Sequence, residues 1–444
     1  MKRKEKILLL YPGEFHSQGW GRFICLKPHM VYIYSYLQRF FDVTVLDLEN
    51  EFSRPQTPEE LAVFKTKSLK RIQGIDADMV AISCWSSLNY LSSVFFAEAI
   101  KKERPDTPII VGGYHPTFLP RDFTYPESPF DVVVQGEIQN IFKAIHKDRF
   151  EAIETYRIVP DFRTYPYFDH QKTLGIFLGA GCPFNCRYCM EYKRKWSSLR
   201  VEEAIDLILR LKRDYDPHYF TIFDACFGLN NRWRKAFLSA LSKADLDCYF
   251  WLETRVDVVD EEDLELMSGL KIKMDFGVDS FSRTMLNIMN KTRNPDAFLK
   301  TFVKISSICN RLDILHDVYL IFDHPGETRE TYAEFKQFFQ DVVRQRLEGG
   351  HLRVKYQRFS YYPGNYIFNH QEDYARQYGF KAIHPEWWRR AGDHYLSSRE
   401  IIPSVDEHGQ PFHVPLKETS KMVKAFNRKA KEEALWQKLH AFDL

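Results

Sequence analysis

The sequence predicts an α/β protein: an N-terminal doubly wound parallel sheet, then a partial (β/α)6 barrel, then a small C-terminal extension. Short apolar runs alternate with segments of helical periodicity along most of the chain. One stretch rich in Tyr, Pro, Asp and Arg interrupts this alternation. The length of 444 residues also allows two or three separate cores. We therefore expect units at 1–150, 151–172 (a linker), 173–360 and 361–444.

The first unit contains five apolar runs that are typical of buried strands. A parallel sheet with both faces covered has strands that are continuously apolar, and helical segments such as 94–102 separate the runs here. The turns GGYHP and QGE follow two of the runs, at the strand ends where open α/β sheets bind ligands. The strands are expected at 6–11, 42–48, 78–85, 108–113 and 131–137.

The second unit repeats the alternation of strand and helix. Its first helical segment, VEEAIDLILRLKRDY at 201–215, places apolar residues three or four positions apart, as an amphipathic helix does. Six βα units predict a partial barrel, whose active site would lie at the C-terminal ends of the strands. The strands are expected at 174–178, 219–223, 249–253, 273–277, 317–322 and 353–359.

Composition excludes several classes of protein. The chain has 62 basic and 60 acidic residues, and a net charge of +2 gives no support for a nucleic-acid partner. No apolar run approaches the roughly 20 residues of a membrane helix, and the N-terminal run is too short for a signal peptide. Eight cysteines in so long a chain do not make a disulfide framework. A cytoplasmic location is expected.

Three cysteines form the pattern CxxxCxxC directly after the first strand of the second unit: Cys182, Cys186 and Cys189. A structural zinc site has four ligands, so zinc would have to recruit a fourth such as His170. A disulfide would leave one thiol over. An iron–sulfur cluster normally takes four thiolates, so three would leave one iron open to a small molecule.

The segment CPFNCRYC resembles the cysteine loop of radical SAM enzymes. The resemblance implies a 4Fe-4S cluster on the three cysteines, with S-adenosylmethionine (SAM) bound to the remaining iron. In that family one electron cleaves SAM to methionine and a 5′-deoxyadenosyl radical. The resemblance also implies that Tyr188 lies beside the adenine and that a flavodoxin or ferredoxin supplies the electron.

The resemblance is to the class of radical SAM enzymes that has an N-terminal cobalamin-binding-type domain. VGGYHPTFLP and DVVVQGE are similar to segments of that domain, whereas FWLETRVDVVD, FGVDSFS, HPGETRETY and YYPGN are similar to barrel segments. Asp279 replaces the usual Glu in one motif, and Ala225 replaces an Asp in FDACF. The cofactor contacts that the resemblance implies are Tyr188, Asp224, Glu253, Arg255, Asp279, Gly112, Gly113 and His115.

Simpler roles remain open for some of these residues. Glu253 and Arg255 would also pair with each other on a strand end, and Asp279 would also cap the helix that follows it. His115 would serve equally well as a loop residue without a cofactor.

Several segments depart from the family pattern. FDHPGET places Asp323 and His324 at a strand end, where they would transfer protons or form a polar turn. Cys226 is either a packed apolar residue or a functional thiol. No DxHxxG motif is present, but its absence is common in the class that the chain resembles and does not settle cobalamin binding. The bulk of His29 and Tyr34, where Gly and Ala are usual, would fill space that a corrin needs.

An aromatic segment near the C-terminus has two interpretations. It would close the barrel mouth over a large hydrophobic substrate, or its tryptophans would seal a core. Its residues are Trp387, Trp388, His394 and Tyr395.

Two enzymatic functions follow from the resemblance. The first is hydrogen abstraction from an unactivated carbon of a bulky, hydrophobic or polycyclic small molecule, followed by cobalamin-dependent C-methylation. The second is cobalamin-free oxidation, hydroxylation, cyclisation or elimination, as in bacteriochlorophyll or natural-product tailoring. A non-catalytic metal-binding module is the alternative from another class.

Overall fold

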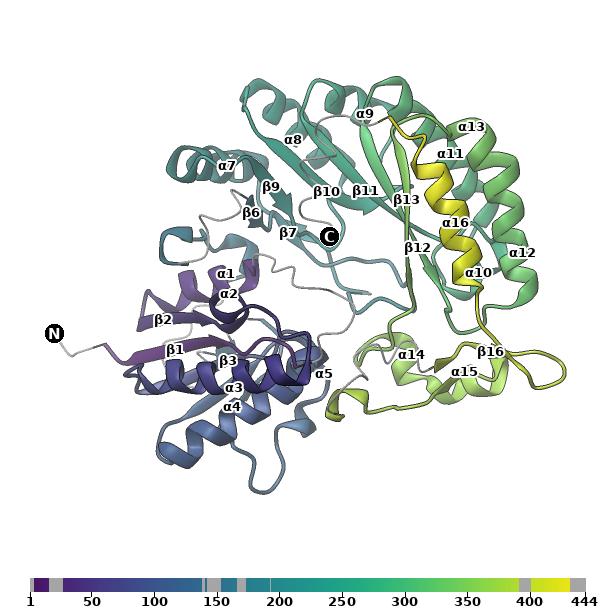
Figure 1. Ribbon diagram of the computed structural model, residues 1–444. Coiled ribbons are helices and arrows are strands. Elements are labelled where there is room, and N and C mark those ends of the chain that lie inside the picture. Colours follow the sequence, from purple (N-terminus) through teal and green to yellow (C-terminus); the bar gives the residue numbers. More distant parts are fainter. Residues whose placement is uncertain are drawn as a thin grey trace.

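Two parallel sheets form the framework of the chain, and helices pack on both of them (Figure 1). The computed structural model describes residues 4–15, 27–137, 140–141, 153–165, 173–191, 193–390 and 401–431. In the described part of the chain, every strand pair of these two sheets is parallel. The predicted fold class is therefore confirmed.

The N-terminal sheet has the five strands that the sequence predicts. They are β1 (Lys6–Tyr11), β2 (Asp42–Asp47), β3 (Met79–Ser83), β4 (Ile109–Gly112) and β5 (Val132–Val134). Their order in the sheet is β2-β1-β3-β4-β5. The strand after β1 is added on one side of it, and β3, β4 and β5 are added on the other side, so the strand order reverses between β1 and β3. Open α/β sheets bind ligands at the C-terminal strand ends beside such a switch point.

Helices cover both faces of this sheet. They are α1 (Pro28–Leu37), α2 (Leu48–Phe52), α3 (Pro58–Gln73), α4 (Tyr90–Glu103) and α5 (Tyr114–Phe118). Along β1, Ile7 and Leu9 pack in the cluster that contains α1, whereas Leu8 and Leu10 pack in the cluster that contains α3 and α4. Successive side chains of a strand point to opposite faces, so two covered faces require an unbroken apolar run.

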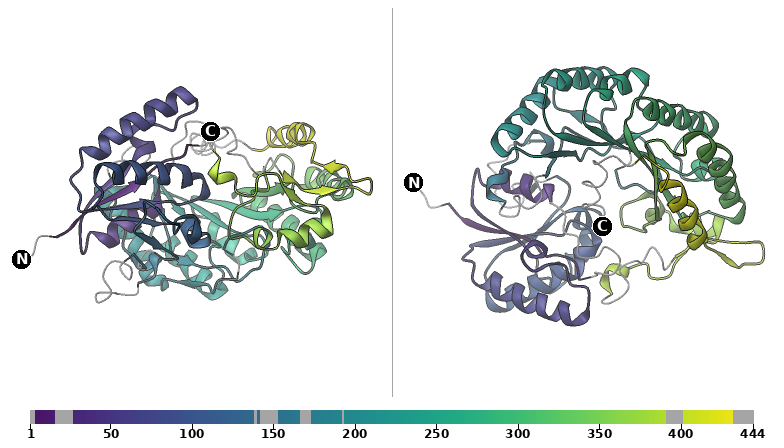
Figure 2. Two further views of the ribbon diagram at one scale, coloured as in Figure 1. Left: turned by 90° about the horizontal axis from the view of Figure 1, so that it is seen from below. Right: turned by 45° about the horizontal axis from the view of Figure 1, so that its top comes forward.

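The second sheet is an open crescent of six strands (Figure 2, right). The strands are β6 (Thr173–Ile176), β9 (Tyr219–Ile222), β10 (Tyr249–Arg255), β11 (Ile272–Asp279), β12 (Leu315–Phe322) and β13 (Leu352–Arg358). They neighbour one another in chain order. Sequential parallel strands with helical connections form part of a βα barrel, as the sequence predicts.

Helices lie along the outer side of this crescent (Figure 2, right). They are α7 (Val201–Tyr215), α8 (Asn231–Lys243), α9 (Glu261–Ser268), α10 (Arg283–Ile288), α11 (Pro295–Arg311), α12 (Arg329–Phe338) and α13 (Gln345–Leu347), with a π-helical turn at Phe339–Arg344 before α13. The bounds of α7 are those predicted from its periodicity. None of the helices in the described ranges is both long and apolar enough to cross a membrane.

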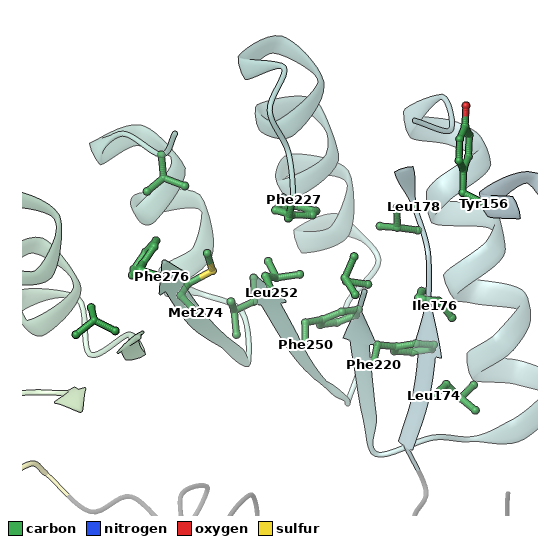
Figure 3. Packing of buried hydrophobic residues seen from close by; sticks show 14 of the residues in the cluster. Tyr156, Leu174, Ile176, Leu178, Phe220, Phe227, Phe250, Leu252, Met274 and Phe276 are labelled. Carbon is green, nitrogen blue, oxygen red and sulfur yellow. The ribbon is translucent and has the colours of Figure 1, made fainter. Parts of the chain in front are cut away.

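Outward-facing side chains of the barrel strands pack against these helices (Figure 3). Phe220, Phe250, Leu252 and Met274 come from three neighbouring strands, and each is buried. Since the side chains of a strand alternate between its faces, the residues between them point into the barrel. The same alternation that builds the apolar core therefore supplies the polar interior.

The barrel interior holds charged side chains in pairs. Lys273 Nζ lies 2.9 Å from Asp275 Oδ1 and 3.0 Å from Asp317 Oδ2, and Lys355 Nζ lies 3.0 Å from the same Asp317 oxygen. A buried charge is tolerated when an opposite charge and hydrogen bonds compensate its lost hydration.

The C-terminal extension covers the edge of the barrel at β13. It contains α14 (Tyr366–Asn369), α15 (Gln371–Tyr378), the pair β14 (Lys381–Ala382) and β15 (Ile401–Ile402), the pair β16 (Ser404–Val405) and β17 (Pro411–Phe412), and α16 (Leu416–Asn427). The Asn427 side chain accepts a hydrogen bond from Val354 N–H at 2.9 Å and donates one to Val354 O at 2.9 Å. It thereby satisfies backbone groups that an edge strand would leave unpaired.

Trp387 and Trp388 seal a core, which was one of the two interpretations of the aromatic segment. Each is 1% exposed. Trp387 Nε1 donates to Tyr361 O at 3.0 Å, and Trp388 Nε1 donates to Asp122 Oδ2 at 2.7 Å. Trp388 therefore ties the C-terminal extension to the N-terminal unit. His394 and Tyr395 lie outside the described residues.

Gly113→Ala should destabilise the N-terminal sheet. Gly113 has a φ of +129°, and a Cβ there would lie 2.2 Å from Cys84 O. We expect the unfolding free energy to fall by about 3 kcal/mol, because neither the clash nor the backbone strain is easily relieved. Chemical denaturation measures the change. Gly269→Ala is the matched control, since no atom of the described residues lies within 4 Å of its Cβ position. Equal midpoints for the two variants would contradict this account of Gly113.

Candidate active site

The three cysteines lie on one loop whose ends are held together by a short antiparallel strand pair. The pair is β7 (Gly179–Ala180) and β8 (Ser197–Ser198), which the sequence did not predict. Arg194 N–H donates to Cys182 O at 2.9 Å, and Lys193 N–H donates to Phe184 O at 2.8 Å. Backbone bonds therefore close the loop independently of any ligand.

Each cysteine sulfur of the loop has its own surroundings. Cys186 is buried and accepts a hydrogen bond from Arg255 Nη1 at 3.6 Å. Cys189 accepts from Glu191 N–H at 3.3 Å, and burial raises its pKa to about 11. Cys182 hydrogen-bonds with Cys226, an interaction that lowers the pKa of Cys226 to about 6.

The donor set of the loop fits a 4Fe-4S cluster. Its three thiols would supply three thiolates, and the buried cations Arg255 and Lys291 beside them would offset the negative charge of such a cluster. Over the described ranges, no three His, Cys, Asp or Glu side chains converge on a point where one metal ion would sit. A 4Fe-4S cluster does not require that convergence, because each thiolate binds a different iron.

Arg255 and Asp279 are both engaged by protein groups beside the loop. Arg255, at the end of β10, binds the Asp257 carboxylate through Nε and Nη2 at 2.9 and 2.7 Å. Asp279, at the end of β11, accepts a hydrogen bond from Tyr188 Oη at 2.5 Å and forms an ion pair with Lys291. The structure thus gathers three of the predicted cofactor contacts next to the cysteines. Their contact with SAM stays a prediction.

Asp224 and Glu253 have different surroundings. Asp224 accepts hydrogen bonds from the N–H groups of Leu178 and Gly179 at 2.8 and 3.0 Å, and burial raises its pKa to about 7. It therefore fixes the backbone that leads into the cysteine loop. Glu253 lies on the interior side of β10, where its side chain remains accessible. The protein around the carboxyl group reduces its hydration and so raises its pKa, although the positive charge of Lys273 opposes this effect.

The side chains of Asp323 and His324 are not hydrogen-bonded to each other in the structure, so they do not form a direct proton-transfer pair. Asp323 Oδ1 accepts from Val414 N–H at 2.8 Å, and Oδ2 lies 3.1 Å from Arg358 Nε. His324 Nδ1 lies 2.8 Å from Pro325 O, and its Nε2 is buried with no hydrogen-bond partner among the described residues. Burial lowers the pKa of His324 to about 4, so its imidazole is neutral at pH 7. A catalytic role for either residue stays a prediction.

A cavity of about 810 Å³ separates the cysteine loop from the N-terminal sheet. Trp85, Gly112 and Gly136 line it from the strand-end side of that sheet, while Gly181 and Met190 line it from the loop. The C-terminal ends of β3, β4 and β5 therefore converge on one space that faces the cysteines, as expected for an open α/β sheet.

Polar contacts join the two walls of this cavity. Tyr114 Oη donates to Glu191 Oε1 at 2.5 Å, and Arg194 binds Glu191 Oε2 at 2.7 Å and Glu137 Oε1 at 2.8 Å. Tyr114 and Glu137 belong to the N-terminal unit, whereas Glu191 and Arg194 follow Cys189 in the loop. The two halves of the chain are thus connected at the candidate site itself.

The expectation that His29 and Tyr34 fill this space is wrong. His29 stacks on Trp85, with 4.0 Å between ring centroids, and forms part of the cavity wall. Tyr34 is packed in the apolar core and donates to Gln38 Oε1 at 2.9 Å. The bulk of these residues is accommodated by ring stacking and by the core, which leaves the cavity open.

Gly112 and Gly113 line the cavity, but His115 is not among its lining residues. His115 is 1% exposed, with Nδ1 2.6 Å from Ser87 Oγ and Nε2 3.1 Å from Asp122 Oδ2. Both ring nitrogens are therefore committed to a buried network. A direct corrin contact by His115 would require that network to open.

Comparison with known families gives residues 176–339 as a match to the radical SAM superfamily and residues 25–146 as a match to the B12 binding domain. The chain therefore combines a B12-binding domain with a radical SAM domain. It has the class architecture in which a B12-binding domain precedes the radical SAM domain, and its superfamily cofactors are a 4Fe-4S cluster and SAM. The cysteine loop described above lies within the matched residues, and its binding of the cluster stays a prediction.

Two curated relatives illustrate the range of similar proteins. An anaerobic magnesium-protoporphyrin IX monomethyl ester cyclase from Rubrivivax gelatinosus is 25% identical over 388 residues, which is 76% of this chain and 66% of that protein. An uncharacterized methyltransferase from Pyrococcus horikoshii is 26% identical over 302 residues, which is 59% of this chain and 63% of that protein. The matches thus span slightly less than two thirds of each relative.

One solved structure has the same arrangement of the two domains. The radical SAM methyltransferase TsrM from Kitasatospora setae, with cobalamin and a 4Fe-4S cluster bound, has a TM-score of 0.66 and 14% identity. The alignment covers 97% of this chain and 93% of that chain. At this identity the likeness concerns the fold alone.

Some residues of the candidate site were missed in the sequence. Lys291 follows a short turn after α10, and nothing in its neighbourhood distinguishes it from a surface lysine. Glu191 and Arg194 had one usable signal, which was their position directly after Cys189. The bond of Glu191 to Tyr114 and that of Arg194 to Glu137 depend on the approach of the two domains, and no local pattern encodes that approach.

Replacing Cys182, Cys186 and Cys189 together by Ala should abolish cluster binding. We expect about four iron and four sulfide per chain in the reconstituted wild type and a background level in the triple variant, because Cys226 beside the loop would supply only a single thiolate. Anaerobic reconstitution followed by iron and sulfide analysis measures this. Cys226→Ser and Cys248→Ala are controls that should keep the iron. A triple variant that retained its iron would refute the assignment.

Proposed function

We propose that this chain is a cobalamin-dependent radical SAM enzyme that methylates an unactivated carbon of a bulky, hydrophobic or polycyclic small molecule. The observation that carries the proposal is the cavity of about 810 Å³ between the B12-binding domain and the cysteine loop. A ligand there would touch both domains at once. The position of the cavity suits a cofactor that transfers a methyl group to a substrate bound near the cluster.

The lining of the cavity supports a large ligand with apolar faces. Leu9, Ile33, Ile110 and Val134 contribute from the N-terminal sheet and α1, and Phe177 contributes from the barrel. Ligand sites are commonly apolar with a few convergent polar groups, and the Tyr114, Glu191, Arg194 and Glu137 contacts supply such groups at one end. In this site cobalamin would supply the methyl group.

The radical SAM domain would supply the hydrogen abstraction. When bound, the cluster provides the electron that cleaves SAM to methionine and a 5′-deoxyadenosyl radical. Cys182, Cys186 and Cys189 would hold the cluster, and Tyr188 and Asp279 would form the neighbouring wall of the SAM site. A flavodoxin or ferredoxin is the proposed electron donor.

A second candidate function is radical oxidation or cyclisation without methyl transfer. It is favoured by the 25% identical relative from Rubrivivax gelatinosus, which is named as a cyclase. That relative acts on a magnesium porphyrin, a flat and hydrophobic molecule, so it supports the same substrate class. In this case His324 would take part as a neutral proton acceptor.

Reduced, reconstituted protein should cleave SAM to 5′-deoxyadenosine and methionine, slowly even without substrate. The open iron and an electron donor are all that this reaction needs. Anaerobic incubation with a strong chemical reductant, followed by chromatography, measures both products. The triple cysteine variant is the control and should form neither. Absence of both 5′-deoxyadenosine and S-adenosylhomocysteine in the wild type would contradict the radical SAM assignment of function.

Stoichiometric retention of corrin should distinguish the two candidate functions. The full chain is expressed with abundant hydroxocobalamin, purified, and measured by its visible spectrum. About one corrin per chain is expected if the cavity binds cobalamin, with S-adenosylhomocysteine as a co-product of methylation. A folded protein that forms 5′-deoxyadenosine but retains no corrin would defeat the methyltransferase and leave oxidation or cyclisation.

A steric variant tests whether the cavity is where corrin binds. Ala225 lines the cavity with an exposed side chain, so Ala225→Trp should fill the space without disturbing a core. Ala62→Trp is the matched control on the exposed face of α3. We expect Ala225→Trp to lose corrin while keeping its iron, and Ala62→Trp to keep both. Full corrin retention by Ala225→Trp would place the corrin elsewhere.

A further inference from the structure

We propose that Arg255 acts on the iron–sulfur cluster and not on the SAM carboxylate, by donating a hydrogen bond to the Cys186 sulfur that makes the cluster easier to reduce. The proposal rests on the assignment of the cluster to Cys182, Cys186 and Cys189. It departs from the family resemblance, which gives Arg255 a contact with SAM.

The guanidinium of Arg255 has almost no donor left for a ligand. Arginine carries five N–H groups. Nε and one Nη2 hydrogen go to Asp257 at 2.9 and 2.7 Å, the second Nη2 hydrogen goes to Lys291 O at 2.9 Å, and Nη1 donates to Cys186 Sγ at 3.6 Å. One N–H group remains, on Nη1. A bidentate grip on a carboxylate needs two parallel N–H groups on one edge, and both edges of this guanidinium are already in use.

Burial and stacking hold Arg255 in this orientation. Its exposed fraction is 6%, and its guanidinium carbon lies 3.8 Å from the centroid of the Phe184 ring. Phe184 is itself part of the cysteine loop, between Cys182 and Cys186. A cation on an aromatic face is favourable, and more so when water is excluded. Turning Arg255 toward SAM would cost its carboxylate, carbonyl, sulfur and ring contacts together.

The hydrogen bond to sulfur has a direct electrochemical consequence. Reduction adds negative charge to the cluster and its thiolates, and a donor aimed at a ligand sulfur stabilises that charge. Cys186 has a cationic donor, whereas Cys189 receives the neutral backbone N–H of Glu191 and Cys182 has the Cys226 thiol as its neighbour. The Arg255 contact is therefore unlike those of the other two ligands.

Asp257 sets how much of the Arg255 charge reaches the cluster. Its carboxylate binds the guanidinium on the edge away from Cys186 and so neutralises the cation. Removing Arg255 and removing the Asp257 charge should consequently have opposite effects on the reduction potential. A residue that merely held the fold would not produce shifts of opposite sign.

The test is a redox titration of reconstituted full-length protein, read by electron paramagnetic resonance, alongside the dissociation constant of SAM. In Arg255→Gln the reduction equilibrium should become at least tenfold less favourable, which is about 59 mV for a one-electron couple. Asp257→Asn should shift the potential in the opposite direction. The affinity for SAM should stay within the error of the measurement in both variants.

Arg187→Gln is the matched control. Arg187 lies in the same loop, and its side chain donates to the Ile288 carbonyl and the Tyr374 hydroxyl and not to a cysteine. Its removal should move the potential less than Arg255→Gln does. If Arg255→Gln fails to hold iron, the direction of the Asp257→Asn shift decides the question.

Two results would overturn the proposal. One is an unchanged potential in Arg255→Gln with a large loss of SAM affinity, which would return Arg255 to the SAM carboxylate. The other is a shift of Asp257→Asn that is absent or negative. A wild-type protein without iron would refute the cluster assignment instead, so the two failures are distinguishable.

Discussion

The closed backbone of the cysteine loop is the constraint on which the rest of the structure depends. Gly181 makes the closure possible, because it has a φ of +82° and a Cβ there would lie 2.2 Å from Lys195 O. With the loop closed at its base, Cys182, Cys186 and Cys189 are presented before any ligand arrives. The strand ends around the loop then contribute the charged side chains and the packing contacts beside the cysteines. Arg255 and Asp279 supply such charges from β10 and β11, which follow one another in the sheet.

The period of two along the barrel strands gives the site its electrostatics. In β10 and β11 the outward residues are Phe250, Leu252 and Met274, which form the core with the helices. The inward residues at the strand ends are therefore polar without any loss of packing. Several charges in the described part of this interior lie near an opposite one, as the Lys273 and Asp317 pair shows. Such pairing opposes the desolvation by which burial alters the pKa values of isolated ions.

The sequence predicts the fold well because strands and helices are local patterns. Continuous apolar runs located the strands of the N-terminal sheet, the repeated alternation of strand and helix located those of the second sheet, and the helix at 201–215 was predicted to the residue. The cysteines were equally accessible, since their spacing is itself the signal. The orientation of a side chain could not be predicted where contacts with distant parts of the chain determine it. His115 turns into a network with Asp122, and Asp323 reaches Val414, because the C-terminal extension packs there. Bulk at His29 gave a wrong expectation, because stacking on Trp85 is a tertiary contact.

The shared cavity also makes the two domains dependent on one another. Its walls come from both the N-terminal sheet and the cysteine loop, so a ligand that contacts both walls binds only the docked arrangement. Ligands that bind one state in preference to another stabilise it in proportion to the logarithm of their concentration over their dissociation constant. The Arg194 contacts with Glu137 and Glu191 are half-exposed and contribute little alone. The apolar core that α1 shares with the barrel strands and the apolar lining of the cavity therefore contribute more to the coupling than these ion pairs do.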